Sequence, residues 1–120
     1  MKKTILLTIT LLITNKITSQ TVNNIPINEI NTKYIEIIGS CKTLKNEWEI
    51  SIDYGQKTKW TTERKQKTLL KNKKPMLFNS MIAALNFMHN YGYEFNNAFP
   101  IDYKNDKIIE YRYLLKKIKN

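Results

Sequence analysis

The stretch EWEISIDY (residues 47–54) decides the fold class, because apolar and polar residues alternate along it without a break. One face of the extended chain is apolar, formed by Trp48, Ile50, Ile52 and Tyr54. The other face is acidic or polar, formed by Glu47, Glu49, Ser51 and Asp53. This period of two is typical of a strand in an antiparallel sheet that is covered on one side only.

The segments on either side of this strand predict a small antiparallel sheet. Residues 34–38 (YIEII) are β-branched and aromatic, and Gly39 follows them, which favours a strand that ends there. Residues 40–46, with Cys41 among them, suit a hairpin loop between the two strands. Residues 59–62 (KWTT) predict a short third strand.

The segment after Pro75 predicts one helix with both ends specified. Asn79 or Ser80 can accept the first free amide hydrogens, and Gly92 supplies a left-handed stop. Four apolar residues recur at helical spacing and form a stripe that requires a sheet beneath it: Met81, Ala84, Leu85 and Met88.

After Gly92 the period returns to two. One predicted strand places Tyr93, Phe95, Asn97, Phe99 and Ile101 on a single face, and a last strand does the same with Ile109, Tyr111, Tyr113 and Leu115. A turn through residues 104–107 joins them. The order ββ(β)αββ predicts an α+β domain over residues 33–117 with two layers: an antiparallel sheet of about four strands and one amphipathic helix packed on one face. We expect the alternating aromatic residues to form the apolar floor for the helix.

The beginning of the chain predicts export. Residues 1–19 combine Lys2 and Lys3, an apolar run over residues 4–14 and a polar end, which is the order of a cleavable signal peptide. The apolar run is about half the length of a membrane span, so no integral span is expected after cleavage. Residues 20–32 are polar, contain Pro26 and predict a flexible leader. We expect the mature domain to be periplasmic or extracellular.

The positive charge is concentrated in one segment. The formal net charge is +10, and the three lysines of the predicted signal peptide leave +7 on the mature chain. Residues 57–74 hold one acid, Glu63, and eight basic residues: Lys57, Lys59, Arg64, Lys65, Lys67, Lys71, Lys73 and Lys74. Two interpretations stay open, a solvated loop and a contact with an anionic surface. Lysine lacks the planar fork of arginine, so no specific nucleic-acid recognition is expected.

No residue pattern indicates catalysis, a cofactor or a metal site. His89 and Cys41 are the sole residues of their types, and nothing in the pattern orients one toward the other. The carboxylates of Glu47, Glu49 and Asp53 share a strand face, and paired carboxylates can carry out glycosidase chemistry, but their spacing is already explained by the solvated face of a half-buried strand. A single cysteine cannot form an internal disulfide.

Three stretches carry a resemblance to a known group of proteins: FNSMIAALNFM (residues 78–88), GYEF (residues 92–95) and YRYLLKK (residues 111–117). As a set they resemble small secreted proteins of unknown function from Bacteroidetes, over roughly residues 34–117. The resemblance repeats Glu94, which we expect to pair across strands with Arg112 or Lys116. That group has an acidic or neutral loop containing glycine where this chain has RKQKTLLKNKK (residues 64–74).

These observations predict a non-enzymatic binding or structural module of the cell envelope, with an unknown envelope component as its partner. The alternative is a binder of an anionic polymer, such as lipopolysaccharide, lipid headgroups or extracellular DNA, through residues 57–74. An exported hydrolase is a remote third interpretation.

Overall fold

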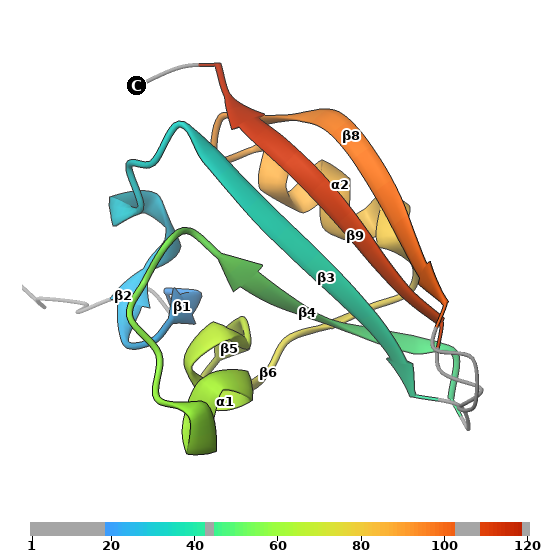
Figure 1. The fold of residues 1–120 in the computed structure, drawn as a ribbon, viewed down its shortest axis with the longest axis horizontal. Coiled ribbons are helices and arrows are strands. Elements are labelled where there is room, and N and C mark those ends of the chain that lie inside the picture. The colour runs from blue at the N-terminus through green and yellow to red at the C-terminus, as the bar shows by residue number, and fades with distance from the viewer. Residues whose placement is uncertain (1–18, 43–44, 103–108, 119–120) are drawn as a thin grey trace, which may run out of the picture.

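The computed structural model describes residues 19–42, 45–102 and 109–118 and contains two antiparallel sheets (Figure 1). The larger sheet has five strands in the order β7-β4-β3-β9-β8. Its strands are β3 (Tyr34–Lys42), β4 (Glu47–Asp53), β7 (Leu77–Phe78), β8 (Tyr93–Asp102) and β9 (Ile109–Lys117). The predicted strand over residues 47–54 is therefore confirmed, and it lies between β3 and β7.

The smaller sheet consists of two hairpins in the order β2-β1-β5-β6. Its strands are β1 (Thr21–Val22), β2 (Ile25–Pro26), β5 (Leu70–Lys71) and β6 (Lys74–Pro75). Both hairpins turn through two residues with positive φ, Asn23 and Asn24 in the first, Asn72 and Lys73 in the second. Two such residues between paired strands are the signature of a type I′ turn, which matches the twist of the strands.

Two α-helices accompany the sheets, α1 (Glu63–Lys67) and α2 (Met81–His89), with short 3-10 turns η1 (Ile27–Glu29) and η2 (Trp60–Thr62). The predicted ends of α2 are confirmed, since the Ser80 hydroxyl accepts a hydrogen bond from the Ala83 amide and Gly92 has a φ of 84°. In Figure 1, α2 lies behind β9 and β8, and α1 lies beside the smaller sheet.

The core lies between α2 and one face of the larger sheet and continues toward the smaller sheet. The helix contributes Met81, Ala84 and Met88 as buried residues, while Leu85 is half-buried. The sheet contributes Ile35, Ile37, Ile50, Ile52, Tyr93 and Leu115. Val22, Ile27, Ile30, Leu69 and Phe78 complete the buried cluster.

The expectation of a two-layer α+β domain with one sheet of about four strands and a single helix is wrong, because the structure has a four-stranded and a five-stranded sheet and two short helices. The second sheet forms by pairing Thr21 with Leu70, residues distant in sequence. Strands of two residues carry no periodicity, so local pattern cannot reveal them. Residues 59–62, predicted as a strand, contain the turn η2.

Residues 20–32 are not a flexible leader in the structure. Val22, Ile27 and Ile30 are buried in the core, and the amide of Ile27 donates a hydrogen bond to the Gln20 carbonyl at 2.9 Å. These three residues have no regular spacing in a polar segment, so local pattern did not indicate that they would be buried.

Two further details differ from the predictions. Strand β3 continues to Lys42, so Cys41 lies in the strand opposite Trp48 and not in a hairpin loop. A bulge between Phe95 and Asn97 reverses the alternation of β8, so that Phe95 and Phe99 point to opposite faces. Tyr93 is buried as expected of the floor, whereas Phe95 and Phe99 are exposed.

The predicted signal peptide (residues 1–19) and the turn at residues 104–107 lie outside the described residues, apart from Ser19. None of the helices in the described part of the chain is long and apolar enough to cross a membrane.

Candidate functional site

The face of the larger sheet opposite α2 is mainly polar. Directly paired residues point to the same face of a sheet, and Glu36 pairs with Asp53 while Ile38 pairs with both Ser51 and Arg112. A Cβ built on the adjacent Gly39 would instead meet the Met81 side chain of α2. The two faces of β3 therefore have different surroundings. One face packs against α2, and the other forms the floor of an open groove.

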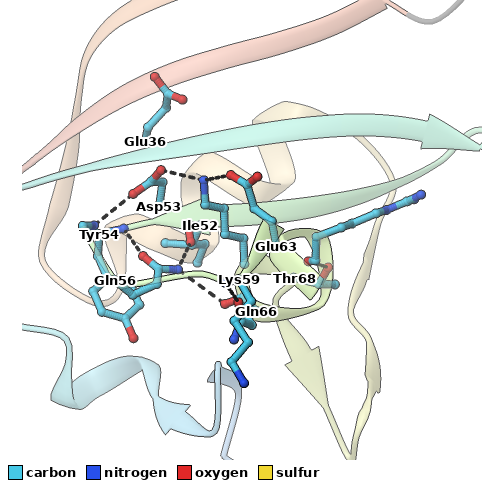
Figure 2. Close-up of polar contacts among 12 residues, drawn as sticks. Glu36, Ile52, Asp53, Tyr54, Gln56, Lys59, Glu63, Gln66 and Thr68 are labelled. Carbon is cyan, nitrogen blue, oxygen red and sulfur yellow. Dashed lines mark hydrogen bonds and ion pairs between the residues drawn. The ribbon is translucent and has the colours of Figure 1, made fainter. Parts of the chain in front are cut away.

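One wall of this groove is the segment that contains η2 and α1, and side-chain amides hold it in place (Figure 2). Gln56 Nε2 donates to the Ile52 carbonyl at 2.8 Å, and Gln56 Oε1 accepts from the Tyr54 amide at 2.8 Å. Gln66 Oε1 accepts from the Lys59 amide at 2.8 Å, which closes the loop before η2. The position of the wall is therefore fixed by hydrogen bonds to the backbone.

Lys67 ties α1 to the end of β4. Its Nζ lies 2.9 Å from Asp53 Oδ2 and 2.7 Å from Glu63 Oε1. The pKa of Lys67 is raised, first by the hydrogen bond with Glu63 and then by the one with Asp53. Burial alone would raise the pKa of Asp53, but the hydrogen bonds from Lys67 and the Gly55 amide outweigh it and lower that pKa. Both groups therefore stay charged at neutral pH.

The groove between this wall and strand β9 has a volume of about 520 Å³. Its lining carries four carboxylates, those of Glu36, Asp53, Glu63 and Glu110, and three cations, those of Arg64, Lys67 and Arg112. Ser40, Ser51, Ile38 and Trp60 complete the lining. The charges nearly balance, and ion pairs hold several of them in place: Arg112 lies 3.2 Å from Glu36 and 3.9 Å from Glu110.

Trp60 is the unusual member of the lining because it is 92% exposed. Tryptophan is among the most buried residue types on average, and Trp60 is the first residue of η2, whose backbone belongs to the wall of the groove. A large flat apolar surface thus stands at the edge of a polar groove. One feature of the sequence could have indicated that Trp60 is exposed, namely its position within the polar run KTKWTTERKQK. We instead predicted a strand over residues 59–62.

The eight basic residues predicted for an anionic surface are distributed over three segments of the chain. Lys57 and Lys59 precede η2; Arg64, Lys65 and Lys67 lie on α1; Lys71, Lys73 and Lys74 lie on the β5–β6 hairpin. Lys67 is engaged by two carboxylates, and Arg64 lies 4.0 Å from Glu49 at the groove. The other six side chains are exposed.

The predicted catalytic alternatives gain no support from the geometry. Asp53 has a lowered pKa, the opposite of what a general acid requires, and Glu49 is buried near Arg64 instead of solvated. His89 is exposed at the end of α2, and Cys41 is half-exposed in β3. Within the described residues, no group of three His, Cys, Asp or Glu side chains is placed to hold a metal ion.

Glu94 lies directly opposite Lys116 in the β8–β9 register, which is one of the two partners expected for it. The other expected partner, Arg112, pairs with Glu36. Comparison with known proteins found no matching family model, no matching curated protein and no matching solved structure. The resemblance to secreted Bacteroidetes proteins therefore stays a prediction.

Proposed function

We propose that the mature domain is an exported, non-enzymatic binding module of the cell envelope and that the groove beneath Trp60 is its binding surface. The main support for this proposal is that Trp60 is 92% exposed at the rim of a groove whose wall is fixed by hydrogen bonds. Fixed positions reduce the entropy lost on binding. An exposed indole also offers a large contact area with few rotatable bonds.

Binding is favoured over catalysis by the state of the charged groups. Asp53, Glu63 and Lys67 form one ion-paired group that supports the wall, and Arg112 is held by Glu36. Groups that satisfy one another supply fixed hydrogen-bonding sites, whereas a general acid or base needs a pKa near the working pH.

The experiment is retention of the purified mature domain on envelope fragments from the cells that produce it. Trp60→Ala should weaken retention by about tenfold or more, because tryptophan is one of the residue types enriched among binding hot spots. Ile82→Ala is the matched control, since Ile82 is 65% exposed on α2, across the sheet from the groove. Equal retention of both variants and the wild type would overturn the proposal.

A second candidate, contact with an anionic surface, is favoured by the β5–β6 hairpin. Its type I′ turn fixes the backbone that carries Lys71, Lys73 and Lys74, and all three are exposed. Changing these three lysines to Gln should reduce retention on anionic vesicles at about 50 mM salt, where screening is weaker than at physiological ionic strength. A wild-type domain that passes anionic vesicles, lipopolysaccharide and DNA without retention would exclude this candidate.

A further inference from the structure

We infer that the ligand of the groove is a carbohydrate chain composed mainly of uncharged, hydroxylated sugars; this inference rests on the proposed function. The groove combines three features that such a ligand needs at once. These are an aromatic platform, a dense set of fixed polar groups, and a nearly neutral charge balance.

The charge balance disfavours a strongly charged ligand. Four carboxylates and three cations line the groove. A polyanion entering it would meet the carboxylates of Glu36, Asp53 and Glu110, and a polycation would meet Arg112, Lys67 and Arg64. A ligand without net charge is repelled neither by the carboxylates nor by the cations.

The fixed polar groups match hydroxyl chemistry. A sugar hydroxyl donates one hydrogen bond and accepts others. A carboxylate can accept from it and a neighbouring guanidinium group can donate to it. Arg112 lies 3.2 Å from Glu36, which places a donor and an acceptor next to each other on the floor. The hydroxyls of Ser40 and Ser51 add groups that can do both.

The aromatic platform supplies what the polar groups cannot. The ring faces of sugars carry C–H groups that pack on flat aromatic surfaces, and the indole of Trp60 presents such a surface to solvent. The volume of about 520 Å³ lies within the usual range for small-ligand sites.

A peptide is the main alternative ligand for the groove, but the sheet that forms the floor of the groove does not favour peptide binding. Strands β3 and β9 are interior to the sheet, with neighbours on both sides. Beside the groove, the outer edge of β4 is covered by the bridge between Ser51 and Thr68 and by the hydrogen bond that the Leu69 amide donates to the Ile50 carbonyl. Their backbone groups are already paired, so an extended peptide cannot add to the sheet there. Among the described residues that line the groove, Ile38 and Trp60 are the apolar ones, which leaves no apolar pocket for side chains or acyl chains.

The test compares three samples of the same envelope fragments: untreated, digested with protease, and oxidised with periodate followed by borohydride. Periodate cleaves the vicinal diols of sugars and leaves peptide bonds intact, and borohydride removes the aldehydes that would react with lysines. We expect protease digestion to leave retention of the wild-type domain unchanged and periodate oxidation to reduce it by about tenfold or more.

Trp60→Phe and Trp60→Ala complete the test. The phenyl ring keeps a stacking surface, so Trp60→Phe should bind untreated fragments more tightly than Trp60→Ala. Retention that is destroyed by protease and unaffected by periodate would overturn the carbohydrate assignment while leaving a Trp60-dependent binding module intact. Absence of retention on untreated fragments would overturn the proposed function and the assignment together.

Discussion

Lys67 Nζ lies 2.9 Å from Asp53 Oδ2 and so joins helix α1 to the end of strand β4. The helix has five residues, too few to be stable alone in water. Its position therefore depends on contacts such as this one, and the wall of the groove depends on the helix.

Lys67→Met should lower the free energy of unfolding by about 1 kcal/mol, because a partly buried ion pair with two carboxylates is worth more than an exposed one. Lys65→Met is the control, since Lys65 is exposed on the same helix and has no ion pair among those found in the described residues. Urea denaturation measures both. Equal midpoints for the two variants would contradict the anchoring role of Lys67.

The lowered pKa of Asp53 predicts a specific pH dependence. A carboxyl group whose pKa is lower in the folded state contributes stability above its unfolded pKa, and this contribution is lost as pH falls through the folded pKa. The ordinary value is 3.8. The difference in unfolding free energy between the wild type and Asp53→Asn should be constant above about pH 5 and shrink below about pH 4. A difference that stays constant down to about pH 2 would contradict it.

Gly39→Ala should destabilise the protein by about 1–3 kcal/mol, because the added methyl group would overlap the Met81 side chain. Met81 is buried, so its displacement disturbs the contact between α2 and β3. The same substitution in a Met81→Ala background should cost much less, since the overlap is gone. An equal loss of unfolding free energy in the two backgrounds would show that Met81 of α2 does not pack closely against Gly39.

Lys73→Gly should raise the free energy of unfolding by about 1 kcal/mol. Lys73 has a φ of 62°, a left-handed conformation that costs a residue with a Cβ about 1–2 kcal/mol, and glycine at this position of a type I′ turn relieves it. Lys74→Gly is the control, because Lys74 lies in β6 and not in the turn. Thermal unfolding distinguishes the two, and a loss of stability in Lys73→Gly would rule out the type I′ turn.

Local pattern could predict the elements that are long and half-buried. Strand β4 alternates over seven residues and α2 has a cap, an apolar stripe and a left-handed stop, so both were predicted from sequence. The smaller sheet could not be predicted, because its strands have two residues each and one pairing joins Thr21 to Leu70.

The groove also could not be predicted from the local sequence pattern. Its lining comes from β3, β4, η2, α1 and β9. The polar residues of β4 were correctly predicted to share one face, but local pattern gave no sign that α1 would lie beside them. The bulge after Phe95 likewise depends on pairing with β9, which the alternating sequence of β8 does not reveal.

The central claim, that the groove is the binding surface, is tested most directly by photocrosslinking in the producing cells. A photoreactive residue replaces Arg64, whose side chain is 80% exposed at the groove, or Ile82, which is 65% exposed on the helix across the sheet. The account predicts a crosslinked adduct from position 64 and none from position 82. Adducts from position 82 alone, or from neither position, would contradict it.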